Sequence, residues 1–374
     1  MAEPAFDRTL LVVVALLLVV GWIVTTSASM DFAADRLGAP WHYAIRHLLY
    51  IGIALAAGVA TFILPLSVWQ KVGGIALLVV VALLLIARIP GIGLAQLGAQ
   101  RWINLGFITL QPSECAKFAM VVFMAGYLTR REYQVRNEWQ GLMLPVLVLA
   151  LLSALVLWSN DFGSTLIIAA VTMGMLFLAG VNLRYFSVLL GVVLSALVVA
   201  VILEPYRLRR LGSYVDPWAQ PFGDGFQVVQ SLIAFGRGEW LGVGLGNSIQ
   251  KLSYLTQAHT DFVYAIWAEE TGFVGAVAVV ALFVVLVGRI LLTARKALAA
   301  RQIFGMHLCY GVAMLFAGQA FINMAVSAGL VPAKGLTLPL ISYGGNSLIV
   351  SACLLALVLR THYEIARDAQ AGAR

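Results

Sequence analysis

Charged residues are scarce in this sequence of 374 residues, in which Asp, Glu, Lys and Arg together make up 11%. Soluble domains carry about 25% charged residues, so a soluble globular protein is excluded. Apolar residues make up 61% and occur in blocks of roughly 18 to 30 residues, long enough to cross a bilayer as helices. The ten blocks cover about 10–29, 44–64, 73–89, 109–128, 141–158, 162–180, 185–203, 262–292, 307–329 and 339–359.

Other absences narrow the class further. No long stretch alternates between apolar and polar residues as the strands of a membrane barrel do, so the helical class is favoured. No Ser/Gly-rich linker, low-complexity tract or short repeat divides the chain. The sequence therefore predicts an all-α polytopic membrane protein with ten transmembrane helices and a single transmembrane domain, residues 1–374.

Metal, disulfide and nucleotide signatures are also missing. The three cysteines, Cys115, Cys309 and Cys353, are scattered over predicted spans and indicate neither a disulfide framework nor a metal site. No zinc spacing, Walker A motif or catalytic triad motif is present. The "GVGLGN" stretch from Gly242 to Asn247 lacks the βαβ context of a dinucleotide fingerprint and is predicted to be a turn.

The distribution of Lys and Arg predicts the orientation. With a cytoplasmic N-terminus, that side carries thirteen Lys and Arg, and the short outer loops carry five. The positive-inside rule thus favours cytoplasmic N- and C-termini, with a large extracytoplasmic loop, 204–261, between helices seven and eight. The net charge of +7 is mostly this topological signal, with affinity for anionic lipid, and does not indicate nucleic-acid binding.

The 204–261 loop is predicted to be ordered because it is rich in Trp and Phe. Its "FQVVQSLIAFG" stretch reads as an amphipathic helix along the outer membrane interface. The apolar face would hold Phe226, Val229, Leu232 and Ile233, and the polar face Gln227, Gln230 and Ser231. The work of the protein is therefore expected on the outer side.

Carboxylates at the start of the eighth span need a reason, because charge in a bilayer is costly. In "AHTDFVYAIWAEETG", Asp261 either caps the helix or acts as a general base at the mouth of a cavity. Glu269 and Glu270 lie two turns deeper on other faces. At least one of them is expected to hydrogen-bond to neighbouring spans.

Two further sites carry charge near the outer side. Glu114 and Lys117 in "QPSECAK" are three residues apart on one helix face and are predicted to pair, which would also hold that face beside a cavity. Asp161 in "NDFGST" precedes the sixth span and is predicted to cap it.

Arginines gather in "YRLRRLGSYVDPW", beside aromatic residues typical of a membrane interface. Arg207 and Arg210 there, with Arg101 and Lys334 in other outer segments, are either interface anchors or a binding site for a lipid-linked pyrophosphate. The "SYGGNS" stretch that begins at Ser342 is either a tight turn or a nest of backbone N–H groups for phosphate.

The strings "YRLRRLGSYVDPW", "GFQVVQSLIAFGRGEWLGVGLGNSIQKLSYL", "AHTDFVYAIWAEETG" and "KGLTLPLISYGGNS" resemble the SEDS family of bacterial cell-wall polymerases, its division branch more than its elongation branch. The resemblance implies a ten-helix fold in the bacterial inner membrane that polymerises lipid II at the outer face of the division septum. It also implies a class B penicillin-binding protein and other divisome membrane proteins as partners.

The resemblance also implies which residues matter. It implies that Asp261 is catalytic, and Lys334 and the Glu114–Lys117 pair match further residues of the family's motifs. The resulting hypothesis is that Asp261 activates the 4-hydroxyl of an acceptor sugar. Substrate contacts would come from Arg101, Arg207, Arg210, Lys334, His259 and Ser342. Mg²⁺ or Mn²⁺ is a candidate cofactor.

Two other classes stay open at this point. A lipid II flippase or transporter would also need polar groups in the bundle, and a pure scaffold for the penicillin-binding protein would need only its surfaces. Within the polymerase class, an elongation-type enzyme is the alternative to a division enzyme. Replacement of Asp261 discriminates between these classes, because only a polymerase needs that side chain.

Overall fold

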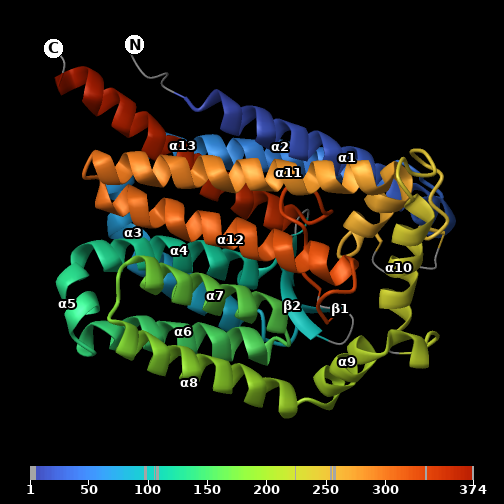
Figure 1. Cartoon of the computed structure of the whole chain (residues 1–374), viewed down its shortest axis with the longest axis horizontal. Coiled ribbons are helices and arrows are strands. Elements are labelled where there is room, and N and C mark those ends of the chain that lie inside the picture. The colour runs from blue at the N-terminus through green and yellow to red at the C-terminus, as the bar shows by residue number, and fades with distance from the viewer. Residues whose placement is uncertain are drawn as a thin grey trace.

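The fold is a bundle of long helices that run roughly side by side (Figure 1). The computed structural model describes residues 6–96, 99–104, 106, 109–223, 225–252, 255, 258–332 and 335–372. The bundle helices are α1 (Arg8–Leu37), α2 (His42–Ile63), α3 (Leu66–Ile86), α4 (Pro112–Arg130), α6 (Gln140–Trp158), α7 (Phe162–Leu178), α8 (Leu183–Ile202), α11 (Val263–Ala299), α12 (Ile303–Ser327) and α13 (Gly345–Gly372). A short helix, α5 (Glu132–Asn137), joins α4 to α6.

The predicted all-helical membrane class is confirmed. Within the described residues, eight helices are long and apolar enough to cross a membrane, namely α1, α2, α3, α6, α8, α11, α12 and α13. The other two predicted spans correspond to α4 and to the 17-residue α7, so the count of ten stays a prediction. Both termini lie at one end of the bundle (Figure 1), as an even number of crossings requires.

Helix α4 lies in the centre of the bundle and is buried along nearly its whole length. It packs against α3, α7 and α12. Helix α8 is the opposite case, with Leu189 as its one buried residue. An apolar side chain gains no hydrophobic free energy by moving from lipid into the protein interior, so a helix that is apolar on all sides can lie at the edge of the bundle. Ser113, Glu114 and Lys117 of α4, in contrast, are enclosed by protein.

The end of the bundle away from the termini carries the irregular structure (Figure 1). An antiparallel sheet is formed by β1 (Gly93–Gln96), β2 (Ala99–Asn104) and β3 (Thr109–Leu110), in the order β1-β2-β3. The long loop folds into α9 (Pro205–Val215), η1 (Pro217–Ala219) and α10 (Phe226–Gly238). The sheet was not predicted from the sequence, because its strands are too short to show alternation.

Helix α10 confirms the helix predicted in the long loop, and it runs across the bundle direction (Figure 1). The prediction of its polar face was wrong at Ser231, which is fully buried. Its hydroxyl donates to the carbonyl of Ser327 at the end of α12, at 2.5 Å. A small hydroxyl that bonds to a helix end can be buried at little cost, and the hydrophobic pattern alone does not reveal such a partner.

Helix α11 is broken at Gly272, whose φ of 70° and ψ of −167° are outside the helical region. Residues after α10 enter the break. The N–H groups of Val243 and Gly244 donate to the carbonyls of Glu269 and Glu270, each at 3.0 Å. The N–H of Phe273 donates to the carbonyl of Glu239 at 2.8 Å. Backbone groups exposed by a break at membrane depth must find partners in the protein, and here the α10–α11 connection supplies them.

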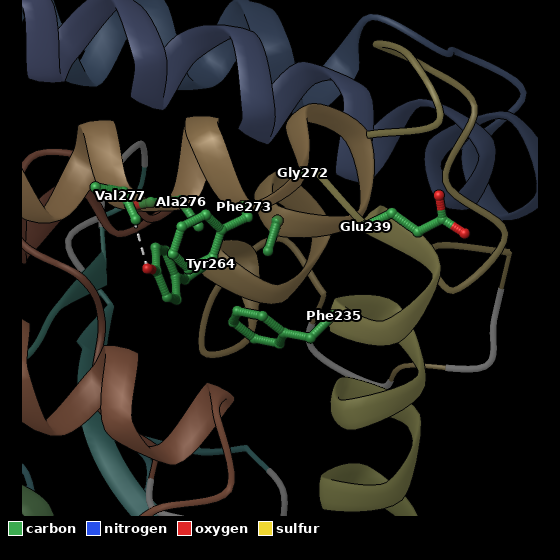
Figure 2. A pocket seen from close by; sticks show the side chains of 8 residues that line it. Phe235, Glu239, Tyr264, Gly272, Phe273, Ala276 and Val277 are labelled. Carbon is green, nitrogen blue, oxygen red and sulfur yellow. Dashed lines mark hydrogen bonds between the residues drawn. The ribbon is translucent and has the colours of Figure 1, made fainter. Parts of the chain in front are cut away.

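The break also leaves a cavity of about 230 Å³ between α10 and α11, lined by Phe235, Tyr264 and Phe273 among others. Figure 2 shows these rings around Gly272, with the Tyr264 hydroxyl bonded to the carbonyl of Ala276 across the break at 3.2 Å. None of the predicted site residues lines this cavity. The site must therefore be sought on the other side of the α11 start.

Candidate active site around Asp261

Asp261 lies in the turn that precedes α11. The helix begins at Val263, and the residue at its N-cap is Phe262, without a side-chain capping bond. The alternative in which Asp261 caps the helix is therefore wrong. The side chain is partly exposed, and its Oδ2 lies close to Gly335, where an added Cβ would sit 3.0 Å away. The carboxylate therefore does not cap α11, and it faces the 335–344 segment.

Asn323 of α12 fixes the backbone on both sides of this carboxylate. Its Nδ2 donates to the carbonyl of Asp261 at 2.9 Å and to the carbonyl of Leu336 at 2.5 Å. The Asn323 side chain is buried. One amide thus joins the turn before α11 to the segment before α13, and it sets the spacing between Asp261 and its neighbours.

The surroundings of Asp261 make its carboxylate a suitable base near neutral pH. Burial raises its pKa from 3.8 to about 6, the guanidinium groups of Arg210 and Arg101 lower it, and the carboxylate of Asp161 raises it. Burial dominates because it penalises the charged form more than the two arginines favour it. A carboxylate with a pKa near 6 is mostly ionised at pH 7 yet basic enough to accept a proton.

Asp161 and Arg101 build one wall beside Asp261. The Asp161 side chain caps α7 by accepting the N–H of Ser164 at 3.0 Å, as predicted, and also accepts the Ser113 hydroxyl at 2.7 Å. Arg101 projects from β2, and its Nε donates to the carbonyl of Ser159 at 2.9 Å. The sheet therefore fixes Arg101 against the end of α6, where its charge reaches Asp261.

Helix α9 brings the arginine pair to the same side. The Arg207 guanidinium lies 5.2 Å above the ring of Phe162, the first residue of α7. The Arg210 guanidinium lies 4.8 Å above the ring of Tyr206, and its charge acts on Asp261. The charges of Arg101 and Arg210 both reach Asp261 and form a basic cluster beside it. Arg207 lies against α7, and its part in substrate binding stays a prediction. Lys334, the fourth predicted cation, lies outside the described residues.

The Glu114–Lys117 pair forms as the spacing predicted, with Lys117 Nζ 2.7 Å from Glu114 Oε1. Lys117 is 1% exposed, and its Nζ also donates to Gln319 Oε1 at 3.0 Å. The Gln319 amide in turn donates to the carbonyl of Thr337 at 3.0 Å. Buried charge needs such partners. The pair supports the segment that faces Asp261, and a direct part in chemistry stays a prediction.

His259 links the turn before α11 to the 335–344 segment, and Ser342 stabilises that segment from within. The carbonyl of His259 accepts the N–H of Tyr343 at 3.0 Å, and the Ser342 hydroxyl accepts the N–H of Leu338 at 2.8 Å. Ser342 is buried. These contacts are structural, and the predicted role of either side chain in substrate binding stays a prediction.

Glu269 and Glu270 are explained by the loop that enters the α11 break. Glu269 accepts from Arg237 Nη1 at 2.5 Å and from the N–H of Ile249 at 3.1 Å. Glu270 accepts from the Ser27 hydroxyl of α1 at 2.5 Å. Internal hydrogen bonding was expected for at least one of them, and both show it. They anchor the connection between α10 and α11 and lie away from Asp261's surroundings.

The fit of a divalent cation can be tested on the residues present. Mg²⁺ and Mn²⁺ take several oxygen ligands, and among the described residues no three or more His, Cys, Asp or Glu side chains gather to hold a metal ion. Asp161, the carboxylate that acts on Asp261, already accepts hydrogen bonds from Ser113 and Ser164. A role for Mg²⁺ or Mn²⁺ therefore stays a prediction, and we derive no step through either ion.

The sequence reasoning did not single out Asn323, Gln319 and Ser113. A signal for the first two was available, because an amide pair four residues apart on one helix face is unusual inside a span. Ser113 carried no such signal, since a serine near a helix start is common. Its contact with Asp161 is a tertiary one.

Comparison with known proteins places this geometry in a family. The model of the cell cycle protein family FtsW/RodA/SpoVE matches residues 7–367. A probable peptidoglycan glycosyltransferase FtsW of Nitrosococcus halophilus is 47% identical over 363 residues, which cover 97% of this chain and 94% of the relative. Its counterpart in Coxiella burnetii is 44% identical over 360 residues, 96% of this chain and 97% of the relative.

Solved structures agree with these relatives. A chain of a peptidoglycan synthase complex, described as coordinating polymerization and crosslinking, superposes with a TM-score of 0.75 at 28% identity, covering 96% of this chain and 97% of that one. The rod shape determining protein RodA of Thermus thermophilus gives a TM-score of 0.70 at 25% identity with the same coverage. The chain belongs to the FtsW/RodA/SpoVE family of cell cycle proteins.

Proposed function

We propose that this chain is a peptidoglycan glycosyltransferase that polymerises lipid II into glycan strands during septal cell-wall synthesis. The relatives that cover nearly its full length carry that activity in their names. The observation that carries the proposal is a partly exposed Asp261 whose pKa is raised to about 6, next to a basic cluster. A base beside cations is what transfer of a sugar from a diphosphate requires.

The reaction follows from these positions. The ionised Asp261 accepts the proton of the 4-hydroxyl of the acceptor sugar. The hydroxyl oxygen forms a bond to the anomeric carbon of the donor, while the bond from that carbon to the diphosphate oxygen breaks. The configuration at the carbon inverts, and the lipid diphosphate leaves as an anion. The basic cluster offsets its charge as it develops, with Lys334 as a further cation.

The setting of the reaction is proposed on related grounds. The relatives with 44–48% identity are named FtsW, and the matching family model describes a cell cycle protein, which favours septal synthesis over elongation. A solved relative belongs to a complex that couples polymerization to crosslinking, so we infer a class B penicillin-binding protein as partner, within a wider divisome. The protein would lie in the bacterial inner membrane with the Asp261 end on the extracytoplasmic face.

The direct test is reconstitution of the chain with its cognate class B penicillin-binding protein in liposomes that contain labelled lipid II. Long glycan on a gel, sensitive to a muramidase, is the expected result. An absence of polymer together with scrambling of lipid II between leaflets would replace the polymerase by a flippase. Lipid II that is neither joined nor moved, in a complex shown to be intact, would favour a scaffold.

A further inference from the structure

The turn before α11 has a second side that the mechanism above does not use. His259 lies only two residues before Asp261, but its ring contacts different parts of the fold. Its ring centroid is 5.1 Å from that of Tyr43 on α2, 5.6 Å from that of Phe32 on α1 and 5.8 Å from that of Tyr343. The turn thus separates the basic cluster from a cluster of aromatic rings.

The aromatic cluster is built on one stripe of α2. Tyr43, His47 and Tyr50 are spaced i, i+4 and i+7, so they share a helix face. The ring of Tyr343 lies against all three, with centroid distances of 5.3, 5.9 and 6.0 Å. Since the N–H of Tyr343 also bonds to the carbonyl of His259, the stripe is linked directly to the turn that carries Asp261.

This cluster is not a closed core. Phe32, Tyr43, His259 and Tyr343 all keep part of their surface exposed. His47 is fully buried, and neither of its ring nitrogens has a hydrogen-bond partner within the described part of the chain. Buried polar atoms almost always have partners, so two unpartnered nitrogens in one ring indicate a place where a polar group from outside the chain completes the contacts.

The chemistry of the cluster suits an amphipathic ligand with a polar rim. Two cations stand at its margin, because the Arg36 guanidinium lies 4.9 Å above the ring of Phe32 and Arg46 acts on Tyr343. Tyrosine and histidine rings combine an apolar body with a polar edge. Burial lowers the pKa of His259 to about 4, so its imidazole is neutral at physiological pH and offers one donor and one acceptor. A pyranose has the matching character, because its C–H groups form an apolar face and its hydroxyl and acetamido groups a polar rim.

The reaction itself calls for two sugar sites that meet at Asp261. The donor loses a diphosphate, so it belongs on the side of the basic cluster. The acceptor contributes only a neutral hydroxyl, and its sugar needs stacking and hydrogen bonds more than charge. We propose that Tyr43, His259 and Tyr343 form the subsite for the terminal N-acetylhexosamine of the acceptor, with His47 beneath it. The assignment of this subsite to the acceptor sugar rests on the proposed function.

Direct binding tests the subsite without any catalysis. The probe is the soluble disaccharide of N-acetylglucosamine and N-acetylmuramic acid, observed by saturation-transfer NMR with the purified full chain in detergent. We expect transfer to the N-acetylglucosamine protons, lost in Tyr43→Ala and kept in Tyr43→Phe, which retains the ring. Tyr133→Ala, at a tyrosine 72% exposed on α5, is the matched control and should bind like wild type.

Kinetics with the penicillin-binding partner complete the test. Loss of one stacked ring in Tyr43→Ala should raise the lipid II concentration for half-maximal rate about fivefold and shorten the glycan, with the maximal rate little changed. Rescue by Tyr43→Phe separates loss of the ring from misfolding. Equal binding and equal kinetics in wild type and Tyr43→Ala would overturn the subsite and leave the polymerase intact. A further outcome is that the disaccharide binds in a Tyr43-dependent way but the wild-type chain makes no polymer. That outcome would support a saccharide site but contradict the proposed function.

Discussion

The charges around Asp261 should control the pH dependence of polymerisation. With a pKa of about 6, Asp261 is about nine-tenths ionised at pH 7 and about one-tenth at pH 5. Only the ionised form accepts a proton, so the rate should rise with pH and reach half its plateau near pH 6. Arg210→Gln removes a charge that stabilises the carboxylate, so the half-point should move to higher pH. Asp161→Asn removes a repelling charge, so the half-point should move to lower pH.

The size of each shift follows from Coulomb's law. Two unit charges roughly 10 Å apart interact by about 1.7 kcal/mol at an effective dielectric constant of about 20, which is roughly one pKa unit. Asn at position 161 can still accept the N–H of Ser164, so α7 keeps its cap.

The assay is the initial rate of glycan formation from labelled lipid II between pH 4.5 and 8, with the complex shown intact at each pH. Lys71→Gln, at an exposed lysine in the second turn of α3, is the control for loss of a charge elsewhere and should keep the wild-type half-point. Half-points that move in the same direction in Arg210→Gln and Asp161→Asn, or a wild-type half-point near pH 4, would show that these charges do not control Asp261.

Three further predictions concern the elements that hold the site. Asn323→Ala frees the backbone of Asp261 and should reduce the maximal rate at least tenfold while KM for lipid II changes little, a split that a general loss of folded protein would not give. Asn323→Asp, which lacks the amide donor, should not restore the maximal rate. Gly272→Ala places a Cβ about 2.4 Å from the nitrogen of Gly242 at a φ of +70°, so it should lower the melting temperature of the purified chain clearly, whereas Gly288→Ala, with open space around it, should not. Lys117→Met leaves Glu114 buried without its partner, which costs roughly 3–5 kcal/mol, and should reduce the yield of folded protein far more than the double change with Glu114→Gln; equal yields would show that the pair is not needed.

The sequence predicted those parts of the fold that depend on local physics. Spans follow from apolar length, and the cap at Asp161 and the Glu114–Lys117 pair follow from spacing along one helix. The position of Asp261 before a span made it a candidate without any structure. The sequence alone could not decide whether Asp261 caps the helix or acts as a base, because the helix start at Val263 depends on packing.

The parts that could not be predicted depend on contacts between distant segments. The break at Gly272 is stabilised by hydrogen bonds from residues 239–244, and nothing in a local window shows which chain will fill a break. Ser231 looks like a polar-face residue until its bond to Ser327 is known. The bond from Asn323 to Asp261 spans 62 residues of sequence, and the pKa of Asp261 reflects burial together with charges from three separate segments.

The most direct measurement of the central claim compares Asp261→Asn with wild type in the reconstituted polymerisation assay. The control is Asp35→Asn, at an exposed carboxylate near the end of α1, with folding and complex formation matched for all three proteins. We expect long glycan from wild type and Asp35→Asn and none from Asp261→Asn, at any pH between 5 and 8. Equal glycan from Asp261→Asn would contradict this expectation, because an amide cannot take the proton of the attacking hydroxyl.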